Sequence, residues 1–302
     1  MFKKAISVKK GGEKVRDKYQ VIEELSKKYT IRLLCEVSGV SRSGFYKWRK
    51  RKFMKTKKQI ENEQIKEKIQ ECYQAVHGIY GYPRVTAWLR KKYNLTINHK
   101  RVYRLMKELG IQAKIRRKRK YFGKKEAYVV SDNHLNREFQ AKRPNEKWVT
   151  DITYLQSNGI RLYLSAIKDL YNNEIVAYQI SHRNDVRLVI DTVKLAIKRK
   201  KDVSGILLHS DQGFQYTSRQ YHALLKQYNI RASMSRKGNC LDNACMENFF
   251  SHLKTECIYM HQFKTAEEMK QAVIQYIEFY NNERIQTKLN SCSPREYLTT
   301  AA

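Results

Sequence analysis

Three acidic residues, Asp151, Asp211 and Glu247, carry the chemistry that this sequence offers. They are separated along the chain by 59 and 35 residues. If the fold brings them together, their carboxylates can bind divalent cations, because hard cations prefer oxygen ligands. Two such ions about 3.5 to 4 Å apart stabilise the attacking and leaving oxygens of an in-line displacement, which is the chemistry of phosphodiester cleavage and strand transfer.

Repulsion among the three carboxylates strengthens the expectation of a metal. At separations of about 5 Å and an effective dielectric of about 20, each pair repels by roughly 3 kcal/mol. Bound cations relieve this repulsion, so two Mg²⁺ ions are expected, with Mn²⁺ as a substitute. The competing interpretation is that these are ordinary turn or helix-capping carboxylates, since a chain with 29 acidic residues contains some such triplet by chance.

The strands expected around the two aspartates favour a shared site. Residues 148–155 alternate with the two-residue period of a strand, which places Asp151 on one face with Val149 and Leu155. Asp211 follows the short apolar run 206–208. That run predicts a buried strand that delivers Asp211 to a glycine-containing turn at a sheet edge.

A helix predicted over residues 242–257 orients Glu247. Apolar residues four positions apart predict its buried side, and polar residues at helical spacing predict its outer side. The apolar stripe consists of Cys245, Phe249, Leu253 and Cys257, and the polar stripe of Asn243, Glu247, Ser251 and Lys254. Glu247 and Lys254 therefore face the same way.

The segments around the carboxylates resemble a known family. The chain reads Trp-Val-Thr-Asp-Ile-Thr at 148–153, His-Ser-Asp-Gln-Gly-Phe-Gln-Tyr at 209–216 and Ser-Arg-Lys-Gly-Asn-Cys-Leu-Asp-Asn-Ala-Cys-Met-Glu-Asn-Phe-Phe at 235–250. Together they resemble the integrase core of OrfB-type DDE transposases, from the bacterial insertion-sequence family called IS-three. The resemblance implies an RNase H-like fold in which Asp151 and Asp211 ligate metal and Glu247 completes the site. Water and then a DNA 3′-hydroxyl would be the successive nucleophiles.

Four further residues are candidates for the site. By the same resemblance Lys254 contacts donor phosphate, although an ordinary surface lysine would fit the position equally well. His209, Gln212 and Asn243 are candidates for groups that support the carboxylates, and each could instead be a turn former.

The chain of 302 residues carries a formal charge of +32, from 61 Lys and Arg against 29 Asp and Glu. Residues 1–140 hold +25 of this excess. A charge this large and this uneven predicts a polyanionic partner, double-stranded DNA, held mainly by the first half of the chain. A single run of lysines is usually just a solvent-exposed face, but that interpretation does not account for a charge of +25 over residues 1–140.

A first basic helical module is predicted from helices that start near residues 17, 30 and 43, with a turn at 38–40. This is the pattern of a helix-turn-helix, whose last helix would present its basic side chains to DNA. The predicted DNA contacts are Arg42, Lys47 and Arg49, with Phe45 and Trp48 packed inward. A small helical bundle with a charged rim is the alternative.

A second module ends in a helix predicted over 99–110, with Arg101, Arg104 and Lys107 on its outward side as DNA contacts. The segments Tyr-Gly-Tyr-Pro-Arg and Asn-His-Lys-Arg-Val-Tyr-Arg-Leu-Met resemble the second helix-turn-helix that precedes the catalytic core in the same transposases. Residues 114–125 contain eight basic residues. Such a linker stays extended until phosphates neutralise it.

Strands predicted at 161–169 and 174–181, followed by alternating helices and strands, indicate an α/β core with a mixed sheet behind all-α helix-turn-helix modules. The C-terminal segments resemble the family signature except at Gln286, where many members carry a histidine, which leaves the role of that position open. The predicted division is a first helix-turn-helix region with a basic tail at 1–58, a second helix-turn-helix module at 59–113, a basic linker at 114–144, the RNase H-like catalytic core at 145–262 and its helical extension at 263–302.

The six cysteines form no C-x-x-C pair and no zinc-finger spacing, which predicts reduced thiols. The sequence has no apolar run of membrane-spanning length and no signal peptide. It therefore predicts a cytoplasmic protein associated with the nucleoid.

The predicted function is that of an insertion-sequence transposase. It would bind the terminal inverted repeats of its element and target DNA as a homo-oligomer, and catalyse metal-dependent strand cleavage and transfer. The resemblance also suggests a fusion or partnership with an upstream helix-turn-helix OrfA protein. Two alternatives are a DNA-binding regulator that lost catalysis, against which the three carboxylates argue, and an RNase H-like nuclease such as a resolvase, against which the two basic modules argue.

Overall fold

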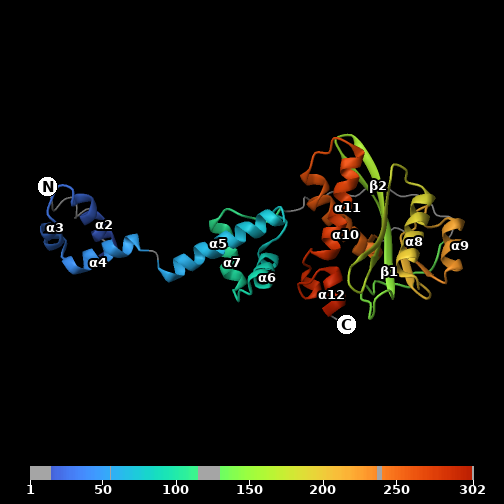
Figure 1. Ribbon diagram of the computed structural model, residues 1–302, viewed down its shortest axis with the longest axis horizontal. Helices are drawn as coiled ribbons and strands as arrows, with labels where there is room; N and C mark the ends of the chain where they lie inside the picture. The colour runs from blue at the N-terminus through green and yellow to red at the C-terminus, as the bar shows by residue number, and fades with distance from the viewer. Residues whose placement is uncertain (1–14, 55, 115–129, 237–239, 301–302) are drawn as a thin grey trace. The chain divides into compact units, whose positions relative to one another are not determined.

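The computed structural model of the protein describes residues 15–54, 56–114, 130–236 and 240–300 (Figure 1). The chain forms two compact units, residues 1–71 and 72–302. Residues 115–129 of the predicted basic linker lie outside the described residues. The domain boundaries given above remain predictions.

Three helices make up the first helical module: α2 (Val15–Leu25), α3 (Ile31–Ser38) and α4 (Arg42–Phe53). Gly39 ends α3 with a φ of +65°, a conformation that glycine adopts without a Cβ penalty. Ser41 begins α4, because its hydroxyl accepts a hydrogen bond of 3.0 Å from the backbone N–H of Gly44. The buried core of this module is Ile22, Leu34, Cys35 and Phe45, with Trp48 packed against it.

The next helices are α5 (Lys57–Ala75), α6 (Tyr82–Tyr93) and α7 (His99–Glu108). Pro83 stands in the first turn of α6, where its missing N–H costs nothing. Asn98 caps α7 by accepting a hydrogen bond of 2.8 Å from the Lys100 N–H. Helices α6 and α7 bury the side chains of Val85, Leu89, Val102, Leu105 and Met106.

A five-stranded mixed sheet forms the centre of the second unit. Its strands are β1 (Lys147–Ser157), β2 (Ile160–Asp169), β3 (Ile175–Ser181), β4 (Leu207–Ser210) and β5 (Arg231–Met234), in the spatial order β3-β2-β1-β4-β5. The first three strands are antiparallel, while β4 pairs parallel with β1 and with β5. Asn158 and Gly159, both at positive φ, make the tight turn between β1 and β2.

Helices cover both faces of this sheet (Figure 1). On one face lie α8 (Val186–Lys200) and α9 (Arg219–Gln227), and on the other lie α10 (Ala244–Glu256) and α11 (Ala266–Asn282). Each face of the sheet carries its own apolar core, and alternate residues of β1 contribute to them. Trp148 packs in the core under α8 and α9, whereas Val149 and Leu155 pack in the core under α10 and α11. The remaining elements are the short helices η1 (Cys240–Asn243), η2 (Ile258–Met260), η3 (Thr287–Leu289) and α12 (Pro294–Thr300).

The fold class predicted from the sequence is confirmed: an RNase H-like mixed-sheet domain follows an all-helical region. The predicted bounds differ by one or two residues at several ends: the helix predicted over 242–257, for example, begins at Ala244, after the 3₁₀ turn η1, and ends at Glu256. Five cysteines in the described ranges are free thiols. No helix within those ranges has both the length and the apolar character needed to cross a membrane.

A buried ionic cluster joins α10 to the end of α11. Arg284 donates two hydrogen bonds to Glu256, of 2.7 Å from Nε and 2.6 Å from Nη2, and Tyr276 donates a third of 2.8 Å from its hydroxyl. Both charged side chains are less than a tenth exposed. Although burial opposes ionisation, these donors hold the pKa of Glu256 below its usual range.

The same cluster is where residues from the second helical module meet the core. A guanidinium nitrogen of Arg84, on α6, lies 4.0 Å from the Glu256 carboxylate. The buried hydroxyl of Tyr80 accepts a hydrogen bond of 3.0 Å from the backbone N–H of Ile285. These polar contacts explain why residues 72–114 belong to the same compact unit as the sheet.

Replacement of Glu256 by glutamine is expected to destabilise the protein by about 3 to 5 kcal/mol, because it leaves the Arg284 guanidinium buried without a counter-charge. Urea or guanidinium unfolding of the full chain measures the change. Glu267→Gln, at an exposed position on α11, is the control and should leave the unfolding midpoint where it was. Equal midpoints for the two variants would contradict a structural role for the cluster.

Candidate active site

The sheet register brings Asp151 and Asp211 together. Val149 of β1 lies opposite His209 of β4 in the parallel pair. Continuing this register by two residues sets Asp211, directly after β4, beside Asp151 and on the same side of the sheet. Because neighbouring strands are about 4.8 Å apart, the two carboxylates meet where the carboxyl end of β4 lies beside the middle of β1. Asp211 therefore lies at the end of an inner strand, not on a lateral edge of the sheet.

The electrostatics of the pair agree with this geometry. The pKa of Asp151 is raised well above its ordinary value, first by burial and then by the negative charge of Asp211. A hydrogen bond of 2.7 Å from the Ile152 backbone N–H opposes the rise. Burial also raises the pKa of Asp211, against a hydrogen bond of 2.9 Å from the Gly213 N–H. The two aspartates thus disfavour simultaneous ionisation unless a cation balances them.

Glu247 lies in the first turn of α10 with an exposed side chain. Its charge contributes to the raised pKa of Asp151, while the charge of Lys254 lowers that pKa, so both side chains act on Asp151. Within the described part of the chain, no three His, Cys, Asp or Glu side chains form a group that could hold a metal ion. The structure therefore pairs the two aspartates. Glu247 lies close enough to affect the pKa of Asp151, but its carboxylate does not form a three-residue metal-binding group with them.

Asn243 ties the start of α10 to the strand that carries Asp151. Its buried side chain donates a hydrogen bond of 3.0 Å to the backbone carbonyl of Thr150. Any displacement of α10 along the sheet would break this bond, so Asn243 fixes the position of Glu247 relative to Asp151.

Asp242 is a buried carboxylate that the sequence did not single out. It accepts hydrogen bonds of 2.9 Å from Nη2 of Arg236 and 2.7 Å from Nε of Arg137. The Arg236 hydrogen bond is the largest cause of its lowered pKa, and Arg137 adds to it. This carboxylate is committed to two guanidinium groups, which separates it from the aspartate pair. An acidic residue just before a helix, six positions after an arginine, is the only sequence signal for it.

His209 and Gln212 contact β5 and the segment that follows it. The imidazole of His209 is fully buried between the hydroxyls of Ser233, at 2.8 Å, and Ser235, at 3.1 Å. Burial lowers the pKa of His209 to about 4, so it is neutral at pH 7. Gln212 donates a hydrogen bond of 3.0 Å to the Ser235 carbonyl. Both residues thus brace the end of β4 from which Asp211 projects.

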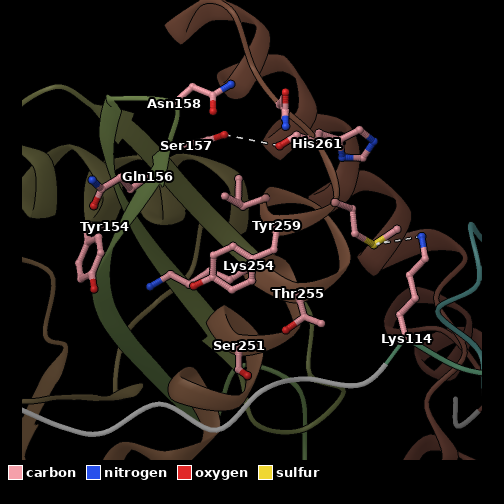
Figure 2. Close-up of a pocket in the computed structure, with 13 residues that line it drawn as sticks. Lys114, Tyr154, Gln156, Ser157, Asn158, Ser251, Lys254, Thr255, Tyr259 and His261 are labelled. Carbon is pink, nitrogen blue, oxygen red and sulfur yellow. Dashed lines mark hydrogen bonds between the residues drawn. The ribbon is translucent and has the colours of Figure 1, made fainter.

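Lys254 borders a cavity of about 800 Å³ between the far end of β1, the polar face of α10 and η2 (Figure 2). Its ammonium group lies 4.5 Å from the ring centroid of Tyr154. The charge of Lys254 lowers the pKa of Asp151, so the lysine connects this cavity with the surroundings of the aspartate pair.

The predicted DNA-contacting side chains of the helical modules are mostly exposed. Arg42, Lys47 and Arg49 project from α4 into solvent, with Arg49 at 3.8 Å from Glu23. On α7, Arg104 and Lys107 are exposed and Arg101 is half-buried. Their role in binding DNA remains a prediction.

Three family models match the chain. Models described as integrase core domain match residues 141–240 and 247–300, and a model described as HTH-like domain matches residues 59–119. Together with the sheet order, these matches define the class of protein: an RNase H-like integrase core with a helix-turn-helix-like domain ahead of it.

Full-length relatives narrow the assignment. The chain is 43% identical to the putative transposase InsK for insertion sequence element IS150 of Escherichia coli strain K12, over 92% of this chain and 96% of the relative. It is 35% identical to the transposase InsF for insertion sequence IS3A of the same strain, over 93% of this chain and 98% of the relative. The chain belongs to the IS3 family of insertion-sequence transposases, the family called IS-three above.

Solved structures show weaker similarity. The catalytic core domain of HTLV-2 integrase in complex with magnesium matches 51% of this chain and 96% of its own, with a TM-score of 0.37 and 14% identity. A simian T-cell lymphotropic virus intasome chain matches 76% of this chain and 74% of its own, with a TM-score of 0.46 and 15% identity.

Asp151→Asn is expected to stabilise the metal-free protein at about pH 8. Folding raises the pKa of Asp151, so the cost of its charge is present above that raised pKa and is absent below about pH 4, where the unfolded chain is protonated as well. Urea unfolding in EDTA should show a higher midpoint for the variant at the higher pH and equal midpoints at the lower one. A less stable variant at about pH 8 would contradict the repulsion.

Proposed function

We propose that this transposase binds the terminal inverted repeats of its element and carries out metal-dependent strand cleavage and strand transfer at the Asp151 and Asp211 pair. The observation that supports the proposal most directly is the parallel register of β1 and β4, which sets two carboxylates side by side under mutual repulsion. A pair held in this way gains stability when a divalent cation binds.

Asp151 and Asp211 would hold Mg²⁺, or Mn²⁺ in its place, and Glu247 would complete the site. Their donor set fits these ions, because all of the donors are carboxylate oxygens. Glu247 would turn its exposed side chain toward the aspartates on binding. The bound ions would supply neutralisation of the charge that develops on the transferred phosphate and activation of the attacking hydroxyl.

The residues around the pair have separate parts in the proposed reaction. The backbone N–H groups of Ile152 and Gly213 orient the two aspartates. Asn243 holds the start of α10 against β1, so that Glu247 can reach the same point. The ammonium group of Lys254 would contact a phosphate of the donor strand, since a positive charge beside the carboxylates attracts the DNA backbone.

The basic first half of the chain would hold the DNA. Two helical modules with exposed arginines and lysines precede the core, as expected for recognition of a duplex end. We further propose that the active form is a homo-oligomer on DNA in the cytoplasm, with an upstream OrfA protein as a fused or separate partner. Size-exclusion chromatography of the protein mixed with a terminal-repeat duplex would measure the mass of the complex and so test whether it is an oligomer.

Asp151→Asn should reduce cleavage and joining of a terminal-repeat duplex by about a thousandfold or more, because several kcal/mol of transition-state stabilisation depend on the ions that this carboxylate would hold. Gel assays with labelled duplex and Mg²⁺ measure both steps, and EDTA should have the same effect on the unaltered protein. DNA affinity should not fall.

Asp202→Asn, at an exposed position after α8, is the matched control and should react at the normal rate. Joining by the Asp151→Asn protein would refute the site. Binding without reaction by the unaltered protein, at any Mg²⁺ concentration, would favour a regulator that has lost catalysis.

DNA affinity should fall steeply with salt, because each neutralised phosphate releases counterions. Lys107→Gln is expected to reduce the slope of log affinity against log salt by about one unit. Lys226→Gln, at an exposed position in the last turn of α9, should leave the slope unchanged. Fluorescence anisotropy over a salt series measures both slopes, and a flat response would contradict DNA binding by the basic modules.

A further inference from the structure

The cavity beside Lys254 contains a narrow recess with two aromatic walls. The recess has a volume of about 130 Å³ and is lined by Tyr154 and Gln156 of β1, Lys254 of α10, and Ile258 and Tyr259 of η2. Tyr154 is 51% exposed and Tyr259 is 49% exposed, so two large rings from different elements present their faces or edges to one space. Figure 2 shows Lys254 extending from α10 toward Tyr154.

We propose that this recess binds one unstacked nucleotide of the DNA strand, with its base against Tyr154 and Tyr259 and its phosphate near Lys254. The inference rests on the proposed function for its DNA substrate and adds a binding site to it. Tyrosine rings stack on any base, because every base has a π face, and such contacts tolerate sequence variation.

The chemistry of the lining favours an anionic, aromatic occupant. Lys114 and Lys254 both border the larger cavity, and none of the thirteen described residues around it is acidic. The amide side chain of Gln156, which lines the recess, can donate to and accept from the polar edge of a base. A base within an intact duplex has both faces covered by its neighbours, so the recess would select a nucleotide that has left the stack.

The distance from the aspartates fits a nucleotide near the reacting bond. Tyr154 follows Asp151 by three residues on β1, about 10 Å along a strand. Lys254 follows Glu247 by seven residues on α10, also about 10 Å along a helix. Because stacked DNA rises by about 3.4 Å per nucleotide and an unstacked strand extends further, the occupant would lie within a few nucleotides of the bond at the carboxylates.

The test compares two probes in EDTA, where no cleavage occurs: a blunt duplex, and the same duplex with a short single-stranded thymidine tail. Fluorescence anisotropy of the full chain should show tighter binding of the tailed duplex. Tyr154→Ala and Tyr259→Ala should each weaken binding of the tailed duplex by about 5- to 150-fold, the usual loss for one base stacked on an aromatic ring, and leave the blunt duplex unaffected. Tyr154→Phe keeps the ring and should keep the preference.

Tyr228→Ala is the matched control, since Tyr228 is an exposed tyrosine at the end of α9. Unchanged binding of the tailed duplex by both recess variants would overturn the proposal, as would equal losses on both probes, which indicate duplex contacts or damage to the fold. If one recess variant does not fold, the other decides the outcome. Because the assay needs no reaction, the two proposals can fail separately. If the unaltered protein shows no cleavage or joining with Mg²⁺ but still prefers the tailed duplex, the proposed catalysis is refuted and the nucleotide site stands.

Discussion

The central constraint in this protein is the repulsion between two carboxylates held on adjacent parallel strands. Asp151 and Asp211 are fixed by the register of β1 and β4, which an apolar core on each side of the sheet keeps from slipping. The pair cannot relax away from one another without breaking that register. The rest of the domain supports this unfavourable arrangement and keeps it in place.

The position of α10 relative to β1 is the second requirement, because the third carboxylate lies on that helix. Its buried side packs on the sheet through Met246, Phe249 and Leu253. At its start, Asn243 binds the backbone of β1, and the pairing of Asp242 with two arginines fixes the turn that precedes the helix. Apolar packing sets how far α10 lies from the sheet, and the polar contacts set its position along β1. Both are needed to position Glu247.

The opposite end of α10 is equally well anchored. Glu256 pairs with Arg284 in a buried cluster that also receives Tyr276, and Arg84 of the second helical module lies at its border. A buried charge pair is specific in its geometry, because each partner is costly to bury without the other. One helix thus connects the surroundings of the aspartate pair, the C-terminal helices and the residues that precede the core. Its polar side, between these two anchored ends, borders the cavity proposed to receive a nucleotide.

Local sequence patterns determined the elements and the candidate carboxylates. Alternation at 148–155, the apolar run at 206–208 and the four-residue stripe from Cys245 to Cys257 each depend on neighbours within a few positions, so the strands and the helix were predicted close to their observed bounds. The family resemblance added the RNase H-like arrangement. The resemblance also named Asp151 and Asp211 together, but only the tertiary structure showed how they meet, since a parallel register joins residues 60 positions apart. The tertiary structure also decided that Asp242 is committed to arginines and that Tyr154 and Tyr259 share a recess. Strand register and side-chain packing are set by distant parts of the chain, and no local period encodes them.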